Sequence, residues 1–190
     1  MVKLDKIYTR AGDQGKTRLS TGAPIEKWDL RVTAYGTVDE VNSVLGLAAL
    51  HAERDILAAI RRIQNDLFDL GADLATPDLG QVLEWEPLRI VDKQVVRLEQ
   101  EIDKMNAELP PLDSFVLPGG TPLASYFHLG RTTSRRAERL IAELAAKPDE
   151  IVSQAALSYA NRLSDWLFVA SRYVNDKGDG DIKWVPGDNR

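Results

Sequence analysis

The sequence predicts an all-α fold, a five-helix up-and-down bundle preceded by an extended Gly-rich N-terminal arm. Five long segments carry apolar residues at intervals of three and four, and short connections separate them. Strands do not alternate with helices, which disfavours Rossmann and P-loop architectures. A chain of 190 residues is long enough for one well-buried core. We therefore expect a single domain, 1–190, divided into an arm (1–29), a helical bundle (30–176) and a tail (177–190).

The arm has no sustained helical period. From Thr9 to Leu19 it forms a loop in which glycines alternate with hydroxyl and cationic side chains. Backbone amides beside glycine can approach a phosphate closely, and Thr, Lys and Arg add donors. The loop is not a Walker A motif, because only two residues separate Gly12 from Gly15 where that motif has four. The pattern fits either a phosphate-binding loop or an ordinary turn-rich arm.

The first two helices are expected at residues 31–53 and 55–75. Apolar residues recur at helical spacing in both, and Asp55 is a good N-cap for the second. Asp39 lies on the polar face of the first helix. There it is either solvated or able to meet an arginine of another helix.

The third helix is expected at residues 88–109, because Pro110 and Pro111 stop it. The loop that follows contains Phe115 and is shaped by proline and glycine. Phe115 in such a loop is either a core plug or a ligand contact.

The last two helices are expected at residues 123–146 and 150–175. The remaining segment is rich in Gly and Asp but contains a late apolar run from Ile182 to Val185. We expect it to form a tail that can fold back.

The fourth helix carries a concentrated stripe of charge. Residues three or four apart share a helical face, so the stripe comprises Arg131, Arg135, Glu138 and Arg139. Three guanidinium groups on one face repel one another unless an anion lies against them, and their planar donors suit phosphate or carboxylate. The alternative is a solvated face with Arg–Glu pairs along the helix.

Composition excludes several functions. The net charge of −5 argues against non-specific nucleic-acid binding. The chain has no cysteine, which excludes disulfides and thiolate sites, and its two histidines, His51 and His128, lie far apart in sequence. No apolar run approaches about 20 residues, and no signal-peptide run begins the chain. We expect a cytoplasmic protein with no membrane association.

Six separated stretches, taken together and in this order, resemble one family, the PduO-type ATP:cob(I)alamin (corrinoid) adenosyltransferases. They cover nearly the whole chain and comprise residues 7–17, 35–43, 63–76, 115–120, 131–139 and 161–165.

The resemblance implies a homotrimer with active sites between neighbouring subunits. It implies catalytic roles for Arg135, Phe115, Arg131 and Asp39, with Asp39 pairing with Arg131 across the interface. Phe115 would lie below the corrin ring, with Phe168 lining the same apolar pocket. The implied ATP contacts come from the arm and the last two helices: Thr9, Arg10, Gly12, Asp13, Gly15, Thr17, Arg18, Lys27, Arg135, Glu138, Arg139 and Asn161.

The implied reaction transfers the 5′-deoxyadenosyl group of ATP to Co(I) of cob(I)alamin, giving adenosylcobalamin and triphosphate. Mg²⁺ would be held mainly by ATP phosphates and water, with Glu138 as the candidate protein ligand. Because the nucleophile belongs to the corrinoid, the chain needs no cysteine or Ser–His nucleophile. A separate cob(II)alamin reductase is expected to supply the electron, and an adenosylcobalamin-dependent enzyme to receive the product.

Two alternatives stay open. A different ATP-using enzyme, such as a kinase or ATPase, would need Asp13 or Glu138 as a base. A non-catalytic helical bundle could instead bind corrinoid or nucleotide without transferring a group.

Overall fold

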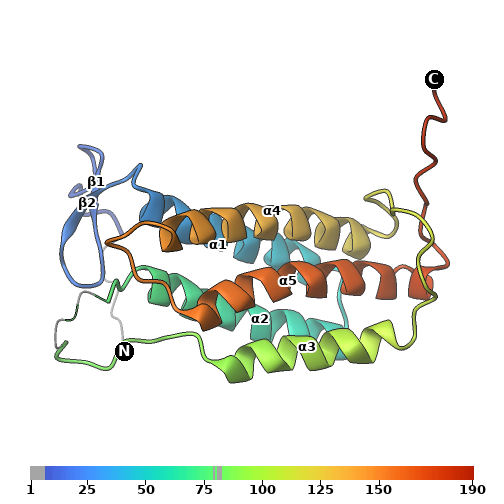
Figure 1. Ribbon diagram of the computed structural model, residues 1–190, viewed down its shortest axis with the longest axis horizontal. Coiled ribbons are helices and arrows are strands. Elements are labelled where there is room, and N and C mark those ends of the chain that lie inside the picture. The colour runs from blue at the N-terminus through green and yellow to red at the C-terminus, as the bar shows by residue number, and fades with distance from the viewer. Residues whose placement is uncertain (1–6, 79, 81–82) are drawn as a thin grey trace.

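The computed structural model describes residues 7–78, 80 and 83–190, and within them it has five α-helices and one small sheet (Figure 1). The predicted five-helix all-α fold is confirmed, and the first six residues of the predicted arm lie outside the described part. The arm contains an antiparallel hairpin that the sequence did not indicate, with Lys16 paired to Glu26. The elements are β1 (Lys16–Arg18), β2 (Pro24–Glu26), α1 (Leu30–Ala49), α2 (Arg54–Leu74), α3 (Asp92–Asn106), α4 (Pro122–Ala145), α5 (Gln154–Tyr173) and the 3₁₀ turn η1 (Asp176–Gly178).

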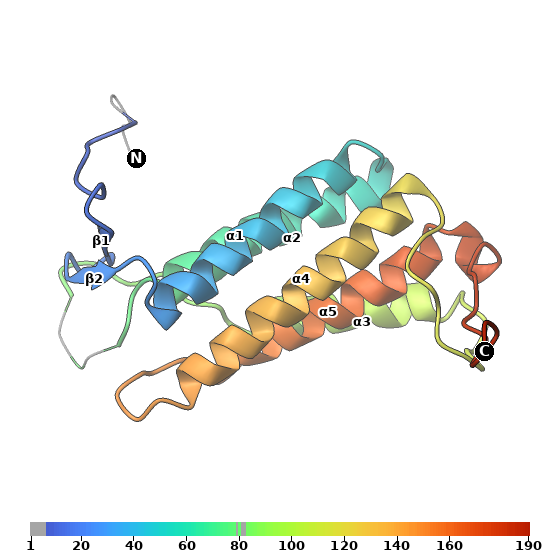
Figure 2. The same cartoon turned by 90° about the horizontal axis from the view of Figure 1, so that it is seen from above.

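The helices run alternately up and down, and α4 lies between α1 and α5. α2 packs against α1 and α3 packs against α5, and both lie on the same face of this layer, behind it in Figure 2. The hairpin, the start of α1 and the ends of α2 and α4 therefore gather at one end of the bundle (Figure 1). The loop before α4 and the tail lie at the opposite end.

The core is built from the apolar stripes that predicted the helices. Phe127 of α4 meets Trp166 of α5 edge to face, with ring centroids 5.6 Å apart, and both are fully buried. Aliphatic side chains from the other helices complete the core, including Leu45, Ile60, Leu70 and Leu98. Burial of such side chains from water is the main stabilising contribution to a bundle of this kind.

Three helices begin at well-formed caps. The Asp29 carboxylate accepts from the Arg31 N–H (2.8 Å) before α1, Thr121 caps α4, and Ser153 caps α5. The expectation that Asp55 caps α2 was wrong. Glu53 is the N-cap residue without a side-chain cap bond, and Asp55 lies in the first turn, where its charge suits the helix dipole.

α3 begins four residues later than the predicted residue 88. The Ile90 N–H donates to an Asp73 carboxylate oxygen (2.9 Å), and the Arg89 guanidinium donates to Asp73 (2.7 Å) and to the Thr76 carbonyl (2.6 Å). These long-range bonds hold the segment extended. α5 likewise begins at Gln154 instead of residue 150, because Ser153 supplies its cap.

α2 and α3 are joined across their gap by polar side chains. Gln94 of α3 donates to Asp66 of α2 (2.9 Å), and Arg62 of α2 pairs with Glu101 of α3 (2.5 Å). Asp66 also accepts from the buried Tyr159 hydroxyl (3.0 Å).

Of the helices in the described part of the chain, none is long and apolar enough to cross a bilayer.

Candidate functional site

The α4 charge stripe is present as the spacing predicted. Arg135 and Arg139 are exposed, and neither forms an ion pair within the described part of the chain. Glu138 does not pair with these arginines, since its carboxylate accepts from the Asn161 amide of α5 (2.7 Å). The alternative of Arg–Glu pairs along the helix is therefore not what the structure forms. Arg135 and Arg139 thus present positive charge that no carboxylate among the described residues pairs with.

Arg131 is the half-buried member of this stripe. Its guanidinium carbon lies 6.0 Å from the ring centroid of Phe168, and its Nε has no hydrogen-bond partner among the residues described. Burial, and then the positive charge of Arg135, lower the pKa of Arg131. A partly desolvated guanidinium whose Nε has no acceptor among the described residues favours binding of an anion. Asp39, its predicted partner, is exposed on α1 and makes no ion pair within the described chain.

His128 lies one turn before Arg131 and is 3% exposed. Its Nδ1 also lacks a partner among the described residues. Burial lowers the pKa of His128, the nearby Arg131 charge lowers it further, and Asp181 of the tail opposes this. The imidazole is therefore neutral near pH 7. Sequence reasoning did not select it as a site residue.

The arm forms a hollow of about 540 Å³ beside its hairpin. Five residues predicted to contact ATP line it: Thr9, Gly12, Thr17, Arg18 and Lys27. The predicted Arg10, Asp13 and Gly15 belong to the same loop. The sequence missed four other residues of the lining: Ala11, Gln14, Lys16 and Pro24.

Two glycines allow this loop its shape. Gly15 has φ +80°, a conformation that residues with side chains rarely adopt. A Cβ at Gly12 would lie 2.9 Å from the Lys27 Nζ, so a side chain there would displace that ammonium group. The Lys27 N–H in turn donates to the Gly15 carbonyl (2.9 Å). The loop thus brings a cation and backbone amides together, as a phosphate site requires.

Phe115 is 77% exposed at the other end of the bundle. It is therefore not a core plug, and its contact with a ligand stays a prediction. The tail folds back onto its loop. The Trp184 N–H donates to the Phe115 carbonyl (2.8 Å), and the two rings lie 5.9 Å apart. Trp184 was not predicted as a site residue, although the apolar run from Ile182 to Val185 was a signal for it.

Asn175 fixes the loop and the tail to each other. Its side-chain oxygen accepts from the Thr121 N–H (3.2 Å), and its amide donates to Asp181 (3.1 Å), which also pairs with the buried Arg172 (2.7 Å). Gly120 has φ +94°, and a Cβ there would lie 2.3 Å from the Asn175 oxygen. The position of Phe115 therefore depends on close packing at Gly120.

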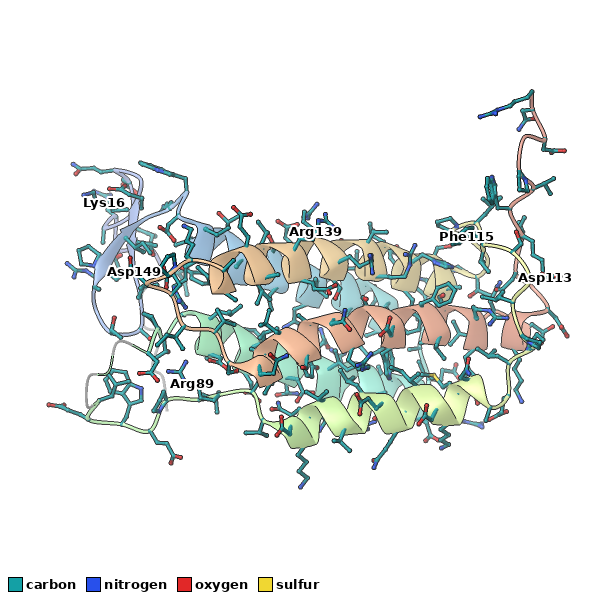
Figure 3. All side chains as sticks on the ribbon, in the orientation of Figure 1. Lys16, Arg89, Asp113, Phe115, Arg139 and Asp149 are labelled. Carbon is teal, nitrogen blue, oxygen red and sulfur yellow. The ribbon has the colours of Figure 1, made fainter. Side chains whose placement is uncertain are left out.

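The three groups of candidate residues do not converge within one chain. Figure 3 shows Lys16 beyond one end of the bundle, Arg139 along α4 and Phe115 toward the opposite end. A single chain thus offers a cationic arm, a cationic helix face and an exposed aromatic ring at separate places. A site that uses all three needs residues from more than one copy.

Comparison with known proteins gives a consistent result. A sequence model of the family "Cobalamin adenosyltransferase" matches residues 7–174. The corrinoid adenosyltransferase of Mycobacterium tuberculosis strain H37Rv is 47% identical over 100% of this chain and 97% of its own length. That of Bacillus subtilis is 42% identical over 94% of this chain and 92% of its own length.

Solved structures agree with the sequence comparison. A variant of the PduO-type ATP:corrinoid adenosyltransferase from Lactobacillus reuteri, complexed with cobalamin and ATP, superposes with a TM-score of 0.85. It is 38% identical, and the match covers 95% of this chain and 97% of that one. A second variant of that enzyme, complexed with ATP, gives a TM-score of 0.82 at 39% identity, over 94% of this chain and 100% of that one.

Proposed function

Because the chain belongs to the cobalamin adenosyltransferase family, we propose that it transfers the 5′-deoxyadenosyl group of ATP to Co(I) of cob(I)alamin. The products are adenosylcobalamin and triphosphate. The observation that carries this proposal is the α4 stripe, where Arg135 and Arg139 lack a counter-ion within the described chain and the Arg131 Nε lacks an acceptor. The triphosphate of ATP is a polyanion suited to that stripe.

The transfer is a displacement at the C5′ carbon of ATP. The cobalt lone pair forms the new bond to C5′, and the C5′–oxygen bond breaks with its electrons leaving on triphosphate. Negative charge grows on the leaving group, so fixed cations and amides around it lower the barrier. We assign this role to Arg135, Arg139, Lys27 and the amides of the Gly12–Thr17 loop. In-line placement of the two substrates supplies the rest.

The remaining predicted ATP contacts complete the nucleotide site. Thr9, Arg10, Asp13, Thr17 and Arg18 would contact ATP from the arm. The bond between Glu138 and Asn161 (2.7 Å) holds those two side chains together beside the stripe.

The proposed active site lies between subunits of a homotrimer. This arrangement accounts for the separation of the arm, the stripe and Phe115 along one chain. It also supplies an acceptor for the Arg131 Nε and an ion-pair partner for Asp39, since each lacks one within the described chain. A strictly monomeric yet fully active sample, measured by light scattering at assay concentration, would contradict a shared site.

Phe115 and Phe168 are proposed to contact the corrinoid. An exposed aromatic ring beneath cobalt would exclude a lower axial ligand and so ease reduction of Co(II) to Co(I). Since the chain has no cysteine, a separate cob(II)alamin reductase is proposed as the electron source. An adenosylcobalamin-dependent enzyme is the proposed receiver of the product, in the cytoplasm.

Mg²⁺ fits this site as a metal held mainly by substrate. Among the described residues, no three His, Asp or Glu side chains converge into a metal cage. Mg²⁺ commonly binds phosphate oxygens and waters with one or two carboxylates, and Glu138 would supply such a carboxylate. When bound, the ion would neutralise part of the phosphate charge.

The test is an absorbance assay of Co(I) loss in the presence of ATP, scored for inorganic triphosphate. We expect one triphosphate for each adenosylcobalamin formed. Release of ADP or phosphate would instead favour a kinase or ATPase. Cobalamin binding without transfer would favour a non-catalytic binding protein.

A further inference from the structure

The hairpin of the arm is fastened to the bundle by Ser20, which lies in the turn between β1 and β2. The Ser20 N–H donates to the Ala75 carbonyl (3.2 Å) at the end of α2, and the Ser20 hydroxyl lies 2.8 Å from the same carbonyl. The hydroxyl also lies 2.6 Å from the Thr76 Oγ1. The Thr76 hydroxyl donates to the Ala72 carbonyl (2.8 Å), so the single Ser20 hydroxyl proton is shared between the Ala75 carbonyl and the Thr76 oxygen. Ser20 thus joins segments 55 residues apart.

The end of α2 is a firm attachment point. The last carbonyls of a helix lack intrahelical partners, and here side chains from other segments satisfy them. The buried Arg31 donates to the Leu74 carbonyl (2.5 Å), while Arg89 donates to the carbonyls of Asp73 (3.0 Å) and Thr76 (2.6 Å).

The hairpin in turn carries the cationic loop. Thr17 and Arg18 belong to β1, and Lys27 directly follows β2. The bond between the Lys27 N–H and the Gly15 carbonyl ties the loop to the base of the hairpin. The direction in which the loop points therefore depends on the hairpin, and Ser20 is the side chain that fastens the hairpin turn to α2.

We propose that Ser20, together with Thr76, is a positioning residue for ATP. This inference rests on the proposed function, in which the arm of one subunit grips triphosphate bound against α4 of a neighbour. An arm that spans two subunits binds better when its angle is set beforehand, because less conformational entropy is lost on binding. Ser20 acts through Thr17, Arg18 and Lys27 and does not itself contact the nucleotide.

The test compares Ser20→Ala with Thr21→Val, a matched control in the same turn. The Thr21 hydroxyl is buried without a hydrogen-bond partner among the described residues, so its loss should leave ATP binding unchanged. For Ser20→Ala we expect KM for ATP to rise about threefold to tenfold, the effect of one net hydrogen bond. KM for the corrinoid and the melting temperature should stay at wild-type values. Ser20→Thr keeps the hydroxyl and should restore ATP binding.

Two outcomes would overturn the proposal. One is an unchanged KM for ATP in Ser20→Ala. The other is an equal rise in KM for ATP and for the corrinoid, which would indicate a general defect of the fold.

Calorimetric titration of ATP into wild type and Ser20→Ala separates this inference from the proposed function. If wild type transfers no adenosyl group, the proposed function fails. The ratio of the two ATP dissociation constants still tests the role of Ser20 in that case.

Discussion

Replacement of Arg31 by methionine tests how the arm end of the bundle is held together. Arg31 is 1% exposed, and its guanidinium joins three segments. It donates to the Leu74 carbonyl of α2 (2.5 Å) and twice to Glu150 (3.2 and 2.5 Å), which lies between α4 and α5. Methionine keeps most of the volume but leaves a buried carbonyl and a carboxylate without their donor.

The size of the loss follows from the burial of the two partners. Removing one member of a buried ion pair costs about 3–5 kcal/mol. The Glu150 side chain keeps 24% of its exposure and can partly rehydrate, so we reduce the estimate for Arg31→Met to about 2–4 kcal/mol. For a chain of this size that loss lowers the melting temperature by about 5–15 °C.

Urea unfolding followed by circular dichroism, at fixed protomer concentration, measures this loss. Arg61→Met is the matched control, because Arg61 is exposed and, among the described residues, its guanidinium donates only to Gln64 on its own helix (2.7 Å). Its change should stay within about 0.5 kcal/mol. A loss below about 1 kcal/mol in Arg31→Met would refute the reasoning, since a lost buried pair should exceed a typical point mutation.

The other predictions concern the site. Arg135→Ala should lower the rate of adenosyl transfer about 100-fold or more without unfolding the bundle. The control Arg136→Ala removes a surface pair with Glu40 and should leave the transfer rate near wild type. Equal rates in the two variants would remove the stripe from the mechanism. Phe115→Ala should impair the reaction that starts from Co(II) more than the one supplied with Co(I), and unchanged spectra of four-coordinate Co(II) in the variant would contradict this. Burial lowers the pKa of His128 in the folded protein. Below the ordinary histidine pKa of about 6.5, the unfolded chain therefore binds a proton at this residue more readily than the folded chain does. The free energy of unfolding consequently falls as the pH falls. His128→Asn should therefore lose less stability than wild type between about pH 7.5 and about pH 5.5 in thermal melts, and parallel losses in the two proteins would show that another group is responsible.

Local pattern predicted the helices better than their ends. Apolar spacing was enough to place all five, because each stripe faces the core. The predicted start of α3 was wrong because Asp73 and Thr76, which precede the connection between α2 and α3, hold Arg89 and Ile90 in an extended conformation. No rule based on neighbouring residues contains that information.

The candidate site divides in the same way. Helical spacing predicted that Arg131, Arg135 and Arg139 share a face. Ser20 could not be predicted from the sequence, because its partners lie 55 and 56 residues away. A role for Trp184 could have been predicted, since an apolar run in an otherwise polar tail indicates a segment that contacts another part of the protein.

The polar contacts between α2 and α3 have a consequence for local opening of the folded protein. α3 packs closely against α5, while its links to α2 include the Gln94–Asp66 and Arg62–Glu101 bonds. Water can replace each partner of such a bond in turn, so this seam can open at low cost. Amide protons of α3 should then exchange with deuterated solvent through a local fluctuation. The amide protons of α1, which packs between α2 and α4, should exchange only through global unfolding.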